Sequence, residues 1–248
     1  MSELTLPGRR AVVTGGAKGI GAAISRAYAQ AGAKVAVWGR DLDALRAICE
    51  EIDGVAVQCD VTSTESVERA TATTIELLGG IDVMVANAAR AGEGLAFETV
   101  DDDLWADVID TNLTGVWRCL RSAVPTFKEQ GHGKVIVIAS LAAVIGMSRA
   151  PAYAAAKSGL LGLSKSAAAA LARYNVQVNT VLPGWVWTEM SAPELNNDAV
   201  RVRLEDRTIQ RRTGSPEDLA GICVYLGSSA SDFHTGDTIR VDGGYLLA

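Results

Sequence analysis

The hydrophobic positions of this chain form short continuous runs that are separated by longer segments of mixed polarity. Runs such as 10–14 and 34–38 lack polar alternation, which is typical of strands that are buried on both faces of a parallel sheet. The segments between the runs are predicted to be helices. The expected strands are 10–14, 34–38, 55–59, 83–86, 134–139, 177–182 and 238–241, and the expected helices are 22–31, 42–52, 63–78, 102–129, 152–174 and 215–226.

This alternation of strands and helices predicts an α/β fold with a doubly wound parallel sheet, in which helices cover both faces. The chain has 248 residues, enough for one such domain. No linker-like segment interrupts the alternation, and no other internal repeat is apparent. We therefore expect a single Rossmann-like domain over residues 1–248.

The regular pattern stops after Pro183 and Gly184. The next segment, 185–213, is polar, charged and long, and its sequence suggests neither strand nor helix. A structureless stretch of this length in a compact domain commonly forms a functional lid. We expect a substrate lid at about 185–213, with the part from 190 onward mobile without ligand.

Charge and cysteine content exclude several classes of function. The chain carries 23 Lys and Arg against 29 Asp and Glu, a net charge of −6, and it has no basic run. Binding to nucleic acid or to an anionic membrane is therefore not expected. The four cysteines have no metal-ligand spacing and only two histidines accompany them, so no metal site is expected. No leader or membrane-spanning segment is apparent, and we expect a reducing, cytoplasmic location.

A glycine-rich segment, TGGAKGIG at 14–21, lies between the first expected strand and the first expected helix. In this context glycines allow the backbone to approach the pyrophosphate of a dinucleotide, which then faces the start of the helix. The alternative is a tight turn whose glycines serve packing alone.

The segment SLAAVIGMSRAPAYAAAK at 140–157 joins the exit of a strand to the start of a helix. Tyr153 and Lys157 are four residues apart and share one face of that helix, and Ser140 can point toward the same spot. A neighbouring ammonium lowers the pKa of a phenol. Lowering it from about 10 to about 7 would take about 4 kcal/mol. The alternative is a packed tyrosine with a solvated lysine.

Taken in order, these motifs resemble those of the classical short-chain dehydrogenases/reductases, including members that act as 3-oxoacyl-ACP reductases. The resemblance covers essentially the whole chain. The segments and residues that carry it are TGGAKGIG at 14–21, Asp60, Asn87-Ala88-Ala89, Asn112, Ser140, Tyr153 with Lys157, Pro183-Gly184 and VDGGY at 241–245.

The resemblance implies hydride transfer between a nicotinamide cofactor and a carbonyl or secondary alcohol. It makes Tyr153 the general acid or base, with Lys157 lowering its pKa and holding the nicotinamide ribose. Ser140 would position the substrate, and Asn112 would anchor a water of the proton relay. Ser140 could instead cap a strand end, and Asn112 could satisfy backbone groups in a kinked helix. Other possible functions are an NAD-dependent sugar or polyol dehydrogenase and a non-catalytic dinucleotide-binding regulator.

The same resemblance implies which residues hold the cofactor, with Asp60 at the adenine and Thr188 at the nicotinamide carboxamide. The expected cofactor-binding residues are Gly15, Lys18, Gly19, Ile20, Gly21, Arg40, Asp60, Val61, Asn87, Ala88, Tyr153, Lys157, Pro183, Gly184, Val186 and Thr188.

The end of the second strand indicates which cofactor is used. A carboxylate there would bind the adenosine ribose and select NAD. The matching position is Gly39, and Arg40 and Lys18 can meet a 2′-phosphate. We therefore expect NADP(H) to be preferred over NAD(H), unless the next residue, Asp41, turns inward.

Two positions depart from the family pattern. Ala89 replaces a glycine that normally lies against the cofactor, so its backbone must avoid glycine-only angles or bear strain. Asn175 replaces a glycine between helix and strand, where asparagine tolerates a left-handed conformation.

The expected substrate pocket is mostly apolar, with Ala142, Met147, Trp185 and Met190 in its wall and Arg90, Glu93 and Arg149 nearby. This mixture indicates a small-molecule carbonyl or alcohol without identifying it. The helix from Ala152 also carries a stripe of small residues, which allows close helix approach. Together with the resemblance, the stripe predicts a homotetramer.

Overall fold

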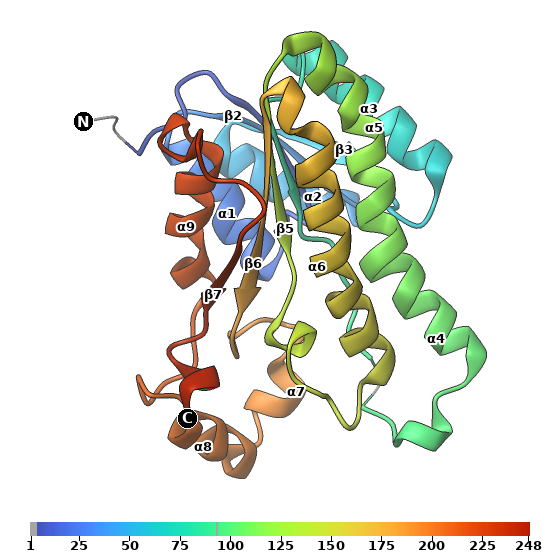
Figure 1. Ribbon diagram of the computed structural model, residues 1–248, viewed down its shortest axis with the longest axis vertical. Helices are drawn as coiled ribbons and strands as arrows, with labels where there is room; N and C mark the ends of the chain where they lie inside the picture. The colour runs from blue at the N-terminus through green and yellow to red at the C-terminus, as the bar shows by residue number, and fades with distance from the viewer. Residues whose placement is uncertain (1–3, 93) are drawn as a thin grey trace.

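The computed structural model describes residues 4–92 and 94–248, so the expected pocket residue Glu93 lies outside the described residues. Within them, parallel strands form one sheet in the order β3-β2-β1-β4-β5-β6-β7 (Figure 1). The doubly wound fold expected from the sequence is confirmed. The strands are β1 (Arg10–Thr14), β2 (Lys34–Gly39), β3 (Val55–Gln58), β4 (Val83–Ala86), β5 (Gly133–Ile138), β6 (Val176–Pro183) and β7 (Thr238–Val241).

Helices cover both faces of the sheet, because successive side chains of each strand point to opposite sides. In β1, Ala11 and Val13 pack into the apolar cluster under α1, α2 and α9, whereas Val12 packs under α3, α5 and α6. The α-helices are α1 (Gly19–Gln30), α2 (Leu42–Ile52), α3 (Thr64–Leu78), α4 (Asp102–Ile109), α5 (Gly115–Gln130), α6 (Pro151–Leu171), α7 (Ala192–Leu195), α8 (Asp198–Arg207) and α9 (Ala220–Gly227).

Several element ends differ from the sequence prediction. Helix α1 begins at Gly19 rather than Ala22, because the glycine-rich segment runs directly into its first turn. The helix expected at 152–174 finishes in a 3₁₀ turn, 172–174, after α6. A 3₁₀ turn at 216–219 likewise precedes α9.

The prediction of a single helix at 102–129 is wrong in one respect. It is interrupted by a π-helical turn, Asp110–Thr114, between α4 and α5. Such turns appear mostly as short bulges within helices, often at functional sites. Asn112 sits in this turn and is completely buried.

The expectation that 185–213 is structureless is also wrong. The segment contains α7 and α8, and Leu195 and Leu204 anchor it to the apolar core. Asn197 caps α8 by accepting hydrogen bonds from the backbone N–H groups of Ala199 and Val200. The sequence of α8, DAVRVRLEDR, did not reveal this helix because most of its positions are charged and its apolar residues do not recur with the helical period.

Asn175 has the left-handed conformation expected for it, with φ of 56°. Ala89 is not among the positive-φ residues of the described chain, so its Cβ is accommodated without that strain. Within residues 4–92 and 94–248, no helix has both the length and the apolar composition needed to cross a membrane.

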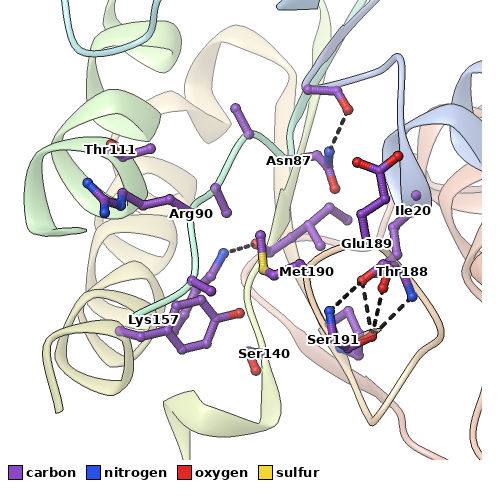
Figure 2. A pocket seen from close by; sticks show the side chains of 18 of the residues that line it. Ile20, Asn87, Arg90, Thr111, Ser140, Lys157, Thr188, Glu189, Met190 and Ser191 are labelled. Atoms are coloured by element: carbon purple, nitrogen blue, oxygen red, sulfur yellow. Dashed lines mark hydrogen bonds between the residues drawn. The ribbon is translucent and has the colours of Figure 1, made fainter. Parts of the chain in front are cut away.

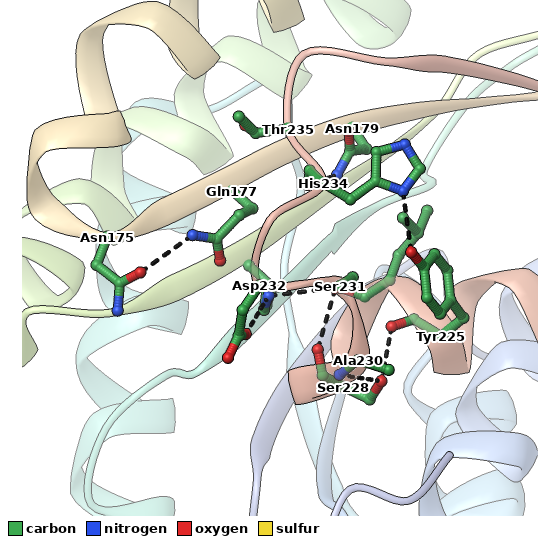
Figure 3. A network of polar contacts seen from close by, with 12 residues as sticks. Asn175, Gln177, Asn179, Tyr225, Ser228, Ala230, Ser231, Asp232, His234 and Thr235 are labelled. Carbon is green, nitrogen blue, oxygen red and sulfur yellow. Dashed lines mark hydrogen bonds and ion pairs between the residues drawn. The ribbon is translucent and has the colours of Figure 1, made fainter. Parts of the chain in front are cut away.

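At the amino edge of the sheet, polar side chains tie the loop after α9 to β5 and β6 (Figure 3). Lys134 Nζ donates to Asp232 Oδ1 at 2.7 Å, and Asn179 Nδ2 donates to the His234 carbonyl at 2.7 Å. Tyr225 Oη lies 3.3 Å from His234 Nδ1. These contacts brace the amino ends of the strands. At the opposite, carboxyl ends, β1 and β4 lie side by side, and a doubly wound fold places its ligand crevice there.

Candidate active site

The glycine-rich loop packs directly against the loop that follows β4. Gly15 and Gly19 have φ of +61° and +50°, values that side chains other than glycine rarely adopt. A Cβ on Gly21 would clash with the Gly15 carbonyl oxygen and lie 2.6 Å from Asn87 Nδ2. Thr14 Oγ1 accepts hydrogen bonds from the backbone N–H groups of Asn87 and Ala88, both at 2.9 Å. The two loops are thereby held as one unit at the start of α1.

A cavity of about 1570 Å³ opens at this edge of the sheet (Figure 2). It is lined by every residue expected to bind the cofactor except Gly21. Gly21 instead packs against the Gly15 carbonyl and the Asn87 side chain. The residues expected to line the substrate pocket, Ala142, Met147, Trp185 and Met190, all face the same cavity.

Three of the four expected catalytic residues line the cavity together. Lys157 is buried, and its Nζ donates a hydrogen bond of 2.9 Å to the Ile138 carbonyl. The same nitrogen lies 5.6 Å from the centre of the Tyr153 ring. Ser140 Oγ accepts a hydrogen bond of 3.1 Å from the N–H of Ala142, so the loop after β5 fixes its position.

The expected effect of Lys157 on Tyr153 is not present in this structure. Burial raises the pKa of Tyr153, and a side-chain hydrogen bond with Ser140 opposes this shift. Burial also lowers the pKa of Lys157 to about 8. In this structure the pKa of the phenol is therefore shifted upward rather than downward, because desolvation disfavours both charged forms.

Asn112 does not line the cavity but holds one of its walls. Its Nδ2 donates to the Arg90 carbonyl at 2.9 Å, and its Oδ1 accepts from the Arg90 N–H at 2.8 Å. This pair of hydrogen bonds ties the π-helical turn to the loop after β4. The Asn112 side chain is therefore a positioning group for that loop.

At the far end of the cavity, Asp60 Oδ1 accepts hydrogen bonds from Thr62 N at 3.0 Å and Thr62 Oγ1 at 2.7 Å. Although burial raises its pKa, these hydrogen bonds and the charges of Arg40 and Arg118 hold the pKa of Asp60 below its ordinary value. Asp60 is therefore an ionised acceptor beside Val61 in this part of the cavity.

The strand end that bears on cofactor choice has Gly39 and Arg40 in the cavity lining. Asp41 caps α2, with Oδ1 accepting from Ala44 N at 3.1 Å. Lys18 Nζ lies 3.5 Å from Asp41 Oδ2 and 3.6 Å from Glu189 Oε2. Sequence reasoning did not single out Glu189, because only the fold brings the segment after β6 to the glycine-rich loop.

These residues fit a nicotinamide dinucleotide. The start of α1 carries no acidic residue in its first turn and no capping side chain, so its N–H groups are open to a phosphate. Gly15 and Gly19 leave the backbone bare beside it, and Asp60 can accept a hydrogen bond farther along the cavity.

The chain belongs to the short-chain dehydrogenase/reductase family: the family model described as enoyl-(acyl carrier protein) reductase matches residues 15–246. It is accordingly an NAD(P)-dependent oxidoreductase.

Curated relatives span almost the whole chain. An L-rhamnose 1-dehydrogenase (NAD(P)(+)) of Azotobacter vinelandii is 34% identical over 246 residues, covering 95% of this chain and 96% of the relative. A 3-oxoacyl-[acyl-carrier-protein] reductase FabG of Chlamydia pneumoniae is 32% identical, covering 98% of each chain. A solved gluconate 5-dehydrogenase of Burkholderia cenocepacia, in complex with NADP and tartrate, matches with a TM-score of 0.95 and 31% identity over 100% of this chain and 98% of that one.

Proposed function

We propose that this protein is an NADP(H)-dependent oxidoreductase that interconverts a carbonyl and a secondary alcohol. The observation that carries the proposal is one continuous cavity that is lined by Ser140, Tyr153 and Lys157 and also by the glycine-rich loop with the bare start of α1. The first group suits proton transfer to an oxygen, and the second suits a dinucleotide.

In this proposal the bound nicotinamide supplies or takes up the hydride. Tyr153 gives its phenolic proton to the carbonyl oxygen in reduction and accepts the alcohol proton in oxidation. The Ser140 hydroxyl, fixed by Ala142 N–H, orients that oxygen. Lys157, held by the Ile138 carbonyl, has further ammonium hydrogens for ribose hydroxyls. Asp60 accepts from the adenine, and Asn112 keeps the loop after β4 in place.

Gly39 and Arg40 support the choice of NADP(H). Gly39 presents no carboxylate to the adenosine ribose, and Arg40 is exposed at the cavity edge with no ion pair among the described residues. A guanidinium can meet a 2′-phosphate with two hydrogen bonds. Asp41, the group that would oppose this preference, also lines the cavity, but its Oδ1 caps α2 and its Oδ2 is paired with Lys18.

The test is the ratio of kcat/KM for NADPH and NADH in the wild type and in a Gly39→Asp, Arg40→Leu double variant. A Cβ on Gly39 would lie 3.3 Å from Leu45 Cδ2, so a small shift accommodates the aspartate. The wild type is expected to favour NADPH, and the double variant to shift the ratio toward NADH by at least about tenfold. A wild type that favours NADH, or an unchanged ratio, contradicts the assignment.

A second candidate is the oxidation of a sugar, polyol or sugar acid. Arg149 lines the cavity near Tyr153 and has no ion pair in the described part of the chain, so it is available to a substrate carboxylate. The dehydrogenases named above act, by their names, on rhamnose and gluconate. A panel of aldoses, aldonates and 3-oxoacyl thioesters, followed by nicotinamide absorbance, separates the two candidates. Arg149→Gln should raise KM for aldonates alone if the carboxylate binds there.

A further inference from the structure

Lys18, within the glycine-rich loop, is shared by two carboxylates that come from different parts of the chain. Its Nζ lies 3.5 Å from Asp41 Oδ2 after β2 and 3.6 Å from Glu189 Oε2 after β6. All three side chains are more than half exposed. Each pair alone is therefore weak, and a stronger anion can displace either carboxylate.

The turn that carries Glu189 is firmly built. Ser191 Oγ donates to the Val186 carbonyl at 2.6 Å, and Thr188 N donates back to Ser191 Oγ at 3.0 Å. Thr188 also packs on the glycine-rich loop, since a Cβ on Gly19 would lie 3.1 Å from Thr188 Cγ2. Figure 2 shows Glu189 beside Ile20 and Thr188, across the cavity from Lys157. The turn thus holds a carboxylate at the beginning of α1.

The beginning of α1 favours an anion. Its first-turn N–H groups have no intrahelical partners, and the helix dipole adds a partial positive charge. The first turn of α1 holds no acidic residue of its own. Glu189 therefore occupies a position where its charge opposes the arrival of a phosphate, and it pairs with the lysine that would otherwise meet that phosphate.

We propose that Glu189 is a determinant of dinucleotide affinity and selectivity: its carboxylate competes with cofactor phosphates for Lys18. This inference rests on the dinucleotide site of the proposed function. Binding of the dinucleotide draws Lys18 from Glu189 and so releases the first turn of the lid from the glycine-rich loop. The effect is larger for NADP(H) than for NAD(H), because the former carries an additional phosphate.

The test is the Kd of NADP⁺ and NAD⁺, measured by isothermal titration calorimetry on the purified full chain. Glu189→Gln keeps the side-chain length and removes the charge. It should lower the Kd for NADP⁺ about two- to fivefold, the range that an exposed ion pair supplies, and the Kd for NAD⁺ less. The difference between variant and wild type should shrink as salt rises from about 0.02 M to about 0.3 M, because salt screens exposed charges.

Two further variants test whether the change in Kd arises from the competition of Glu189 for Lys18. Glu194→Gln makes the same chemical change on the same segment, at another cavity-lining carboxylate with no ion pair among the described residues. It should alter the Kd for NADP⁺ by less than half as much. In a Lys18→Met background, Glu189→Gln should lose most of its effect, because the proposed competition is for Lys18.

An unchanged or raised Kd in Glu189→Gln overturns the proposal, and a raised Kd would mean that the Lys18–Glu189 pair closes over the cofactor instead. An equal effect of Glu194→Gln also overturns it, since the cause would then be the general charge of the lid. If the wild type binds neither dinucleotide, it is the proposed function that fails.

Discussion

At the scale of single residues, Tyr153 is the group proposed to transfer the proton. Tyr153→Phe keeps the ring and removes the transferable proton. We expect turnover to fall at least about a hundredfold, the contribution of a general acid–base group, while the Kd for the cofactor is retained. Steady-state kinetics and calorimetry on the same preparation test both parts. Near-wild-type turnover with a good substrate would rule out Tyr153 as the proton donor.

The pKa shifts at this site predict a pH dependence. Because burial raises the pKa of Tyr153, the phenol stays protonated at neutral pH and is ready to serve as the acid of a reduction. Burial lowers the pKa of Lys157 to about 8, so the ammonium is lost above that pH. The kcat/KM for reduction should be flat between about pH 6 and pH 7.5 and fall above about pH 8. A reduction rate that rises steadily through neutral pH would contradict both assignments.

At the scale of elements, an ion pair joins the starts of β1, β4 and β5. Asp82 is buried, and its Oδ1 lies 2.6 Å from Arg10 Nη2 and 2.9 Å from His132 Nε2. Although burial raises the pKa of Asp82, the hydrogen bonds from Arg10 and His132 lower it to about 2. An acid with a depressed pKa stabilises the fold above its unfolded-state pKa, and this contribution is lost as pH falls toward the folded value.

Asp82→Asn should therefore lower the free energy of unfolding at pH 7 by about 2–3 kcal/mol, and the wild-type advantage should shrink between about pH 4 and pH 2. Urea unfolding at several pH values provides the measurement. Asp206→Asn is the matched control, because its pair with Arg211 is exposed, and little change is expected there. Equal stability of wild type and Asp82→Asn at pH 7 would contradict the prediction.

The segment that we expect to act as a lid also has a testable property. Residues 190–213 contain α7 and α8, so the prediction of mobility concerns opening of formed helices rather than ordering of a coil. Amide hydrogen exchange in this segment should slow when cofactor and substrate bind together, because closure over the ligand protects it. Strand β5 serves as the internal control. Exchange that is the same with and without ligands would show that the segment does not gate the cavity.

At the scale of the whole molecule, α6 presents an exposed stripe of small residues, which includes Ala155, Gly162, Ser166 and Ala170. A Cβ on Gly162 would meet nothing within 4 Å, so a larger side chain there fits the monomer. We expect a homotetramer in which this face is covered by another copy. Gly162→Arg should reduce the mass measured by light scattering without changing the circular dichroism. Ala47→Arg, on the exposed face of α2, is the control. A wild type that is monomeric at micromolar concentration would contradict the expectation.

The sequence by itself determined the fold class and those parts of the site whose residues lie close together in the chain. Strands with uninterrupted apolar runs, such as β5, bury both of their faces only between two layers of helices. The alternation of such strands with helices therefore specifies a doubly wound sheet. The glycines of the loop before α1, and the one-turn separation of Tyr153 and Lys157, are local properties that need no knowledge of distant contacts.

Only the tertiary structure decided the features that depend on residues far apart in the chain. The hydrogen bonds of Asn112 to Arg90, and the approach of Glu189 to Lys18, exist because the sheet brings separate loops to one edge. The direction in which the pKa of Tyr153 is shifted could likewise not be predicted from the sequence. The spacing placed a lysine nearby, but desolvation depends on everything that surrounds the phenol, and here it outweighs the hydrogen bond with Ser140.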